Sequence, residues 1–206
     1  MAYNDKKGTC YIVKNKNICF IPISKNGSTT FRKECENNSI KYEIQNFIET
    51  PSTLKDNHVV CVLREPVERF CSAYLEILIR THDCPKTLEK DFFYIQQEPK
   101  RFLEFIREIK NEFYDTHVEP QTYFITDYEN KMIKIDDFWL LKDLKQKMCA
   151  TFQIKNIRKY NKKSVNNKQI YMDFLNSNPK VKRVIEQLYS EDIILYNQIS
   201  KGEKNE

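Results

Sequence analysis

Two short segments of this 206-residue chain combine residue types that bind anions. The first, SKNGSTT at residues 24–30, follows an apolar run and offers one Gly, one Lys and several hydroxyls. Backbone N–H groups at the start of a helix bind phosphate-like groups, and a Gly lets a ligand approach the backbone closely. The segment therefore predicts an anion cradle. An ordinary capped turn after a strand is the alternative interpretation of the same residues.

The second segment, REPVERFCSAY at residues 64–74, begins where a near-continuous apolar run ends. Arg64 stands at that strand end, and Pro66 suits the first position of a helix. Arg69 and Ser72 are three residues apart, so they share a helix face, which we place opposite the apolar stripe. A guanidinium binds phosphate through two parallel hydrogen bonds, so we expect Arg64 and Ser72 to converge on one phosphate. A solvated, charged helix face is the alternative for Arg69.

Strands that alternate with helices must position these two segments. The apolar runs 11–13 and 18–23 predict a hairpin, whose second strand leads into the first segment. The run 58–63 is typical of a strand buried on both faces, and it leads into the second segment. Helices are predicted at 31–36, at 66–80, from Pro99, at 144–152 and as a pair after Asn178-Pro179, with a strand at 137–141 and a polar loop at 161–169. This alternation indicates an α/β fold with a mainly parallel sheet, in which ligands bind beyond the carboxyl ends of the strands.

Composition and charge bound the class of protein. Hydrophobic residues form 40% of the chain and aromatic residues 13%, too much for a disordered protein. The net charge of +5 suits an anionic ligand as well as it suits nucleic acid. Because there is no run of about 18 apolar residues and no apolar signal-peptide core, we expect a soluble, cytoplasmic protein without a transmembrane segment. Cys19, Cys61 and Cys71 lie in apolar patterns, so we expect reduced, buried thiols and no zinc site.

The two segments resemble the motifs with which sulfotransferases bind their sulfuryl donor. IPISKNGSTTFRK is similar to the 5′-phosphosulfate loop of that family, and VLREPVERFCSAY is similar to its 3′-phosphate motif R-x-P-x-x-R-x-x-S-x-Y. The order of the motifs and their spacing of about 40 residues also fit. The variant is most similar to the Golgi-type carbohydrate sulfotransferases, and weaker similarity extends over HVEPQ (117–121) and over residues 138–144, 160–164 and 189–196. The first segment begins with Ser24, where the family usually has Pro.

The resemblance implies a fold, a sulfuryl donor and a reaction. The fold would be a P-loop NTPase-like, three-layer α/β sandwich that forms a single domain over residues 1–199, followed by a frayed charged tail at 200–206. The sulfuryl donor would be 3′-phosphoadenosine 5′-phosphosulfate (PAPS), and the acceptor a hydroxyl, with a saccharide as the first expectation. We expect no metal and no nucleic-acid partner.

The resemblance also assigns roles to individual residues. Lys25 would bond the bridging oxygen and the sulfuryl group as charge develops on the departing phosphate. His117 is the candidate general base, with Glu34 and Glu65 as carboxylate alternatives, while His58 is expected to be structural and His82 to lie in a loop. The expected PAPS-binding residues are Lys25, Asn26, Gly27, Ser28, Thr29, Thr30, Arg64, Ser72 and Lys162. Arg158 and Lys163 are further basic residues that can close over PAPS, and a solvated basic loop is the alternative for them and for Lys162.

Two other classes of function stay open at this point. A P-loop-like phosphotransferase needs a metal-binding carboxylate and a Lys after the Gly, whereas Lys25 precedes Gly27 here. A non-catalytic module that binds nucleotides or RNA would use the basic and aromatic residues and show steep salt dependence. The basic residues are dispersed along the chain, and no RNA-binding signature is present in the sequence.

Overall fold

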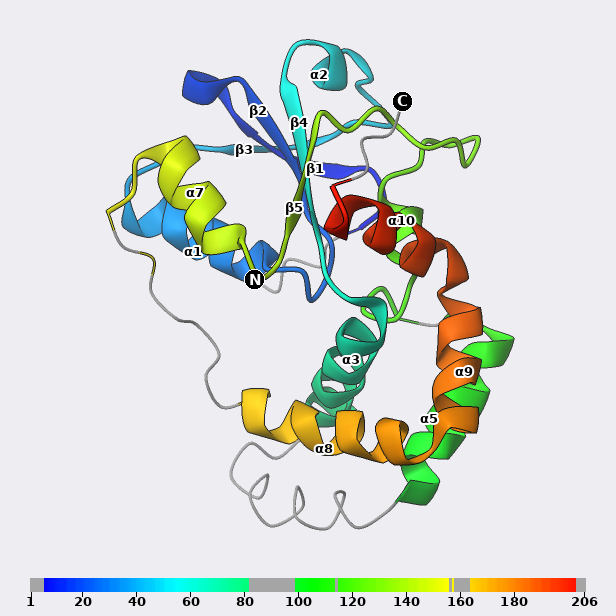
Figure 1. Cartoon of the computed structure of the whole chain (residues 1–206). Helices are drawn as coiled ribbons and strands as arrows, with labels where there is room; N and C mark the ends of the chain where they lie inside the picture. Colours follow the sequence, from blue (N-terminus) through cyan, green and yellow to red (C-terminus); the bar gives the residue numbers. More distant parts are fainter. Residues whose placement is uncertain (1–5, 82–98, 114, 156, 158–163, 203–206) are drawn as a thin grey trace. The chain divides into compact units, whose positions relative to one another are not determined.

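A computed structural model describes residues 6–81, 99–113, 115–155, 157 and 164–202 of the chain. The chain divides into two compact units (Figure 1). The first combines Met1–Arg64, Pro120–Tyr160 and Ile194–Glu206, and the second combines Glu65–Glu119 and Asn161–Ile193. Each unit has its own hydrophobic core. The single domain expected over residues 1–199 stays a prediction.

A five-stranded sheet forms the centre of the first unit. Its strands are β1 (Thr9–Val13), β2 (Ile18–Ile21), β3 (Glu43–Asn46), β4 (His58–Leu63) and β5 (Asp137–Leu140), in the spatial order β3-β1-β2-β4-β5. β1 pairs antiparallel with β2 and β3, which confirms the predicted hairpin, whereas β4 pairs parallel with both β2 and β5. The α/β class is therefore confirmed, and the sheet is mixed: its parallel part consists of β2, β4 and β5.

Alternating side chains bury both faces of this sheet. Val60 and Cys61, neighbours in β4, belong to different hydrophobic clusters on opposite faces, as the twofold period of a strand requires. Helices α1 (Ser28–Asn37) and α7 (Leu144–Phe152) cover one face (Figure 1). The end of α10 (Ser190–Ser200) packs against the other face. The first unit is thus built in three layers.

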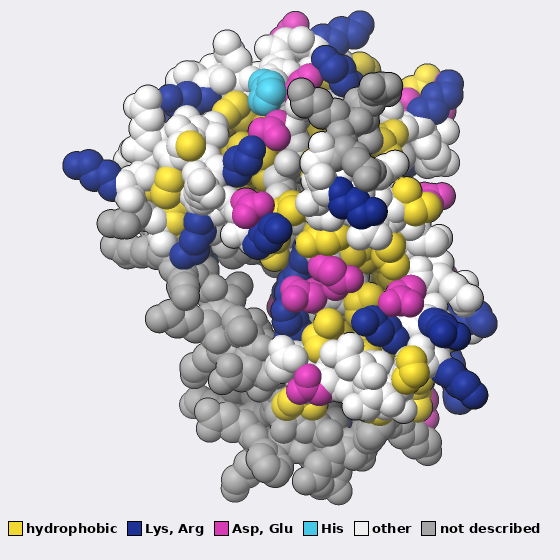
Figure 2. Space-filling model, in the orientation of Figure 1, with side chains coloured by type: hydrophobic (Ala, Val, Ile, Leu, Met, Phe, Trp, Pro, Cys, Tyr) yellow, Lys and Arg dark blue, Asp and Glu magenta, His cyan; other side chains and the backbone are white. Residues whose placement is uncertain are grey.

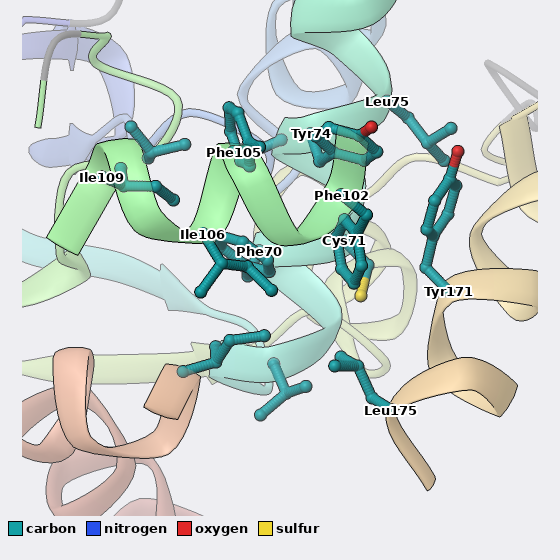
Figure 3. Close-up of a cluster of buried hydrophobic side chains, with 14 of the residues drawn as sticks. Phe70, Cys71, Tyr74, Leu75, Phe102, Phe105, Ile106, Ile109, Tyr171 and Leu175 are labelled. Carbon is teal, nitrogen blue, oxygen red and sulfur yellow. The ribbon is translucent and has the colours of Figure 1, made fainter. Parts of the chain in front are cut away.

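In the described part of the second unit, helices surround an aromatic core: α3 (Pro66–Thr81), α5 (Pro99–Asn111), α8 (Ser164–Ser177) and α9 (Pro179–Leu188). Figure 3 shows Phe70 and Tyr74 of α3 near Phe102 and Phe105 of α5. The ring centroid of Tyr74 lies 4.8 Å from that of Phe102 and 4.7 Å from that of Phe105. Tyr171 of α8 meets Tyr74 edge to face at 5.1 Å. Such ring pairs stabilise a core beyond the area that they bury. The helices predicted at 66–80 and from Pro99 are confirmed.

The structure differs from the sequence-based expectations where polar residues form regular elements. Residues 164–169, predicted as part of a polar loop, are the first turns of α8. The buried apolar side chains that the structure describes in this helix, Tyr171 and Leu175, lie in its second half. The short elements β3, α2 (Ser52–Lys55) and α6 (Gln121–Phe124) were not predicted either, because each has only one or two apolar residues and therefore no apolar run.

Two expectations from composition concern thiols and membrane spans. Cys10, Cys19, Cys35, Cys61 and Cys71 are buried free thiols, in agreement with the reduced state expected. Burial raises the pKa of the Cys35 thiol to about 12, so this thiol stays protonated at neutral pH. Among the helices of the described residues, none combines the length and the apolar character that a membrane crossing needs.

A charged side chain is buried inside the second unit. Arg69 is only 1% exposed, and its Nη1 donates a 2.7 Å hydrogen bond to the carbonyl oxygen of Glu119. The solvated helix face considered for Arg69 is therefore wrong, as is its position opposite the buried stripe. Beside it, the hydroxyl of Tyr189 donates a 2.6 Å hydrogen bond to the carbonyl oxygen of Val118. Burial raises the pKa of Tyr189, so this hydroxyl keeps its proton and remains a hydrogen-bond donor.

We predict that Tyr189→Phe lowers the free energy of unfolding by about 1 kcal/mol or more, measured by urea denaturation. The substitution keeps the ring and removes only the hydroxyl. It leaves the carbonyl of Val118, a fully buried residue, without this hydrogen bond.

The matched control is Tyr128→Phe, which makes the same chemical change on a side chain that is 73% exposed. We expect its unfolding curve to coincide with that of the wild type. If both variants are equally stable, the buried hydrogen bond contributes nothing measurable and the prediction is wrong.

Candidate functional site

Residues 24–30 form a turn and then the first turn of α1, beyond the carboxyl end of β2. The backbone N–H of Asn26 closes the turn by donating to the carbonyl oxygen of Ile23 at 3.1 Å. Lys25 and Gly27 both have left-handed backbones, with φ of 69° and 88°. This conformation costs a residue other than Gly roughly 1–2 kcal/mol, and such strained residues gather at ligand-binding turns. The backbone of Lys25 therefore supports the predicted anion cradle.

The start of α1 presents backbone N–H groups at this turn. Gly27 is the N-cap, and its carbonyl oxygen accepts the N–H of Phe31 at 2.9 Å. The N–H groups of the first helical turn, residues 28–30, have no partner within a helix and carry the positive end of its dipole. A Cβ on Gly27 would overlap Leu144 of α7 and lie 3.1 Å from Leu141. Both the backbone conformation and the available space therefore require Gly at this position.

Arg64, the residue after β4, lies against the same turn. Its Nη1 donates a 3.1 Å hydrogen bond to the carbonyl oxygen of Lys25. The two residues meet because β2 and β4 are parallel neighbours, so both chains leave the sheet at the same edge. A guanidinium has five N–H donors, so a bond to one carbonyl is compatible with phosphate binding. The structure thus brings together Lys25, the start of α1 and Arg64, as the sequence predicts.

Two buried side-chain amides join the segments that carry these groups. Asn26 is 1% exposed and Gln121 is fully buried. Asn26 Nδ2 donates to the carbonyl oxygen of Val62 at 2.7 Å and to Gln121 Oε1 at 2.5 Å. Gln121 Oε1 also accepts the N–H of Arg64 at 2.9 Å, and its Nε2 donates to the carbonyl oxygen of Arg64 at 3.0 Å. Since Asn26 Nδ2 is bonded twice within the protein, we expect Asn26 to position the turn rather than to bind PAPS through that atom.

Other predicted site residues lie outside the first unit. Ser72, on α3, is half-buried and belongs to the second unit, as does His117. The convergence of Ser72 with Arg64 and of His117 with Lys25 therefore stays a prediction. Four residues considered in the sequence analysis lie outside the described part of the chain: His82, Arg158, Lys162 and Lys163.

His117 is held by a carboxylate. Its Nδ1 lies 2.6 Å from Asp115 Oδ1, and its backbone N–H donates to the same oxygen at 2.7 Å. A carboxylate on one ring nitrogen orients an imidazole and stabilises its protonated form, as in many general bases. The ring is also largely buried, at 7% exposed for the residue, which equally fits a structural histidine. The role of His117 as general base stays a prediction.

The two carboxylate alternatives serve local structure. Glu65 caps α3: its Oε1 accepts the N–H of Val67 at 3.1 Å, and its Oε2 accepts the N–H of Glu68 at 2.6 Å. Glu34 is buried in α1, and its Oε2 accepts a 3.2 Å hydrogen bond from Asn38. These contacts favour His117 over both as the general base. Within the residues that the structure describes, no three His, Cys, Asp or Glu side chains are grouped so as to hold a metal ion.

We predict that Gly27→Ala destabilises the protein through two effects. Its positive φ costs about 1–2 kcal/mol for a residue with a Cβ. The overlap with Leu144 adds about 1–3 kcal/mol, because Leu144 is itself buried and has little room to move. Urea denaturation measures the total.

Gly202→Ala is the control for the backbone effect alone. Gly202 has a φ of +75°, and nothing lies within 4 Å of the Cβ that Ala would add. If the two substitutions cost the same free energy of unfolding, the close approach of α7 to Gly27 does not constrain the turn.

Comparison with known proteins identifies a family for this chain. A model of the sulfotransferase family matches residues 7–197, a range that includes both candidate anion-binding segments, Gln121 and His117. Comparisons with curated proteins and with solved structures find no match. The family match covers nearly the whole chain and agrees with the resemblance seen in the two motifs. The chain therefore belongs to the sulfotransferase family.

Proposed function

We propose that this sulfotransferase takes the sulfuryl group from PAPS and transfers it to a hydroxyl of a saccharide. The observation that carries the PAPS assignment is the meeting of Lys25, the start of α1 and Arg64 at one edge of the sheet. A lysine, a helix N-terminus and an arginine each bind anions, and a nucleotide with anionic groups at its 5′ and 3′ positions can contact all three. The saccharide acceptor rests on the similarity of the motifs to the carbohydrate subtype.

The residues present fit such a nucleotide. In the proposal, the N–H groups of residues 28–30 and the hydroxyls of Ser28 and Thr29 bind the 5′-phosphate end. Arg64 and Ser72 bind the 3′-phosphate, with Lys162 as a further cation. Bound PAPS supplies an activated sulfuryl group, so the protein needs to provide position and charge rather than a covalent intermediate.

Two side chains then act on the reaction itself. Lys25 donates to the oxygen that carries the developing negative charge, which is the type of stabilisation that contributes most to transfers of this kind. His117, oriented by Asp115, accepts the proton of the attacking hydroxyl. Arg64 holds the carbonyl of Lys25 and so contributes to the position of the lysine.

The two alternative classes have less support. A phosphotransferase of the P-loop type is disfavoured because the lysine precedes Gly27 instead of following it. An RNA-binding module would gather its cations in one patch. On the face shown in Figure 2, Lys and Arg side chains are scattered, and Asp and Glu side chains lie among them.

Calorimetric titration with adenosine 3′,5′-bisphosphate, the desulfated product of PAPS, tests the proposal. We expect a Kd of about micromolar order for the bisphosphate and much weaker binding of adenosine 5′-monophosphate. A preference for ATP with magnesium would contradict the proposal and favour a phosphotransferase.

We predict that Lys25→Ala lowers turnover by roughly 100-fold or more, because it removes the charge that stabilises the transition state. The affinity for adenosine 3′,5′-bisphosphate should change little, since this product lacks the sulfuryl group. Transfer from PAPS to a panel of saccharides measures turnover. Lys33→Ala, which removes an exposed lysine of α1, is the control, and near-wild-type turnover of Lys25→Ala would exclude the proposed role.

We predict that Arg64→Ala raises the Kd for adenosine 3′,5′-bisphosphate by about tenfold or more, because a hydrogen-bonded charge pair is lost. Arg64→Lys should fall between this variant and the wild type, since it keeps the charge but not the planar fork. Arg107→Ala, on the exposed side of α5, controls for the loss of one positive charge. Equal Kd values for Arg64→Ala and Arg107→Ala would remove Arg64 from the site.

A further inference from the structure

We propose that Gln121 and Asn26 are positioning residues that hold two segments of the first unit, residues 24–30 and 62–64, at a fixed separation. Their effect is to favour a nucleotide with phosphates at both the 5′ and 3′ positions over one with a single phosphate. The part of this inference that concerns nucleotides rests on the proposed function. The clamp itself, defined as the side chains of Asn26 and Gln121 with their hydrogen bonds, rests on contacts within the first unit.

Asn26 continues the hydrogen bonding of the sheet beyond the end of β2. The parallel pairing of β2 with β4 ends at Ile21 opposite Cys61. Beyond that point the side chain of Asn26 supplies a donor to β4, through the 2.7 Å bond from Nδ2 to the carbonyl oxygen of Val62. The turn that carries Lys25 is thereby fastened to the end of β4.

Gln121 does the same for the residue that follows β4. The pairing of β4 with β5 ends at Leu63 opposite Leu140. One residue later, Gln121 bonds both the N–H and the carbonyl oxygen of Arg64, as a neighbouring strand would. Gln121 is the first residue of α6, so a third segment of the chain fixes the backbone from which the guanidinium of Arg64 projects.

The contacts close into a ring. Gln121 Oε1 accepts from Asn26 Nδ2, and Arg64 Nη1 donates to the carbonyl oxygen of Lys25, the residue before Asn26. Asn26 and Gln121 are at most 1% exposed, so water has little access to replace a lost bond. Asn26 Oδ1 is buried without a hydrogen-bond partner in the described part of the chain. An apolar side chain would avoid that unpaired oxygen, but it would not link the turn to Val62 and Gln121.

A fixed separation matters only to a ligand that contacts both segments. In a preorganised site both segments are already ordered when the protein has folded. A bisphosphate therefore gains its contacts with each segment without the free-energy cost of ordering them on binding. A monophosphate contacts one segment and gains less from the distance between them. Loss of the clamp should therefore weaken bisphosphate binding more than monophosphate binding.

Gln121→Met tests this, since methionine has a similar length but no hydrogen-bonding amide. Calorimetry compares adenosine 3′,5′-bisphosphate with adenosine 5′-monophosphate and adenosine 3′-monophosphate. We expect the affinity for the bisphosphate to fall by about tenfold or more and that for each monophosphate by less than about threefold. Gln146→Met makes the same change at an exposed position of α7 and should leave all three affinities unchanged. Equal fold-losses for the three nucleotides, or no loss for any, would overturn the inference.

Amide hydrogen exchange gives a readout that needs no nucleotide. In Gln121→Met, exchange at residues 24–30 and 62–64 should become faster while β1 keeps its protection, and unchanged exchange there would overturn the clamp. If Gln121→Met does not fold, Gln121→Asn takes its place, since it keeps the amide but is one methylene too short to make the same bonds. If the wild type binds none of the three nucleotides, the proposed function fails together with the specificity, and exchange alone decides whether the clamp exists.

Discussion

The parallel pairing of β2 with β4 is the interaction on which the candidate site depends. Two parallel neighbours end at the same edge of a sheet, so the chain segments that follow them meet there. One segment brings Lys25 and the start of α1, and the other brings Arg64. Residues 39 positions apart in the sequence thus come within hydrogen-bonding distance, at 3.1 Å from Arg64 Nη1 to the carbonyl oxygen of Lys25. The hairpin of β1 and β2 and the helices on both faces make that pairing stable by burying it.

Beyond the last paired residues of the strands, side chains make the hydrogen bonds that backbone groups make within the sheet. Asn26 and Gln121 supply the hydrogen bonds that a longer sheet would have supplied, and Glu65 supplies those that begin α3. Polar groups buried in this way leave the strand ends ordered but irregular, and irregular backbone is what an anion cradle requires. The sheet therefore holds the site rigidly, and the side-chain amides of Asn26 and Gln121 fix the path of the two segments that follow β2 and β4.

The sequence predicts those parts of the fold that have a hydrophobic period. Of the candidate site, it predicts only the residues that lie within the two motifs. The bounds of β4 and α7 agree with the strand predicted at 58–63 and the helix predicted at 144–152, because β4 is buried from its second residue onward and α7 buries Leu144, Met148 and Phe152 along one face. Lys25, Gly27 and Arg64 were predicted from residue types that bind phosphate. Gln121 was not assigned a role, since a lone glutamine has no local pattern and its partners lie 57 and 95 residues away. The burial of Arg69 was missed for the same reason: its partner Glu119 is distant in sequence.

Pro22 has a consequence for how the sheet forms. A strand can slip along its neighbour by two residues and keep the same side chains on the same face, so burial alone does not forbid such an error. The carbonyl of Asn17 accepts from His58 of β4, so the N–H groups of the even-numbered residues of β2 face β1. A slip that brings Pro22 into the ladder with β1 would therefore place a residue without an N–H where β1 expects a donor. The proline marks where the hairpin pairing must stop, and this leaves residues 24–30 outside the hairpin, where they form the turn and the start of α1.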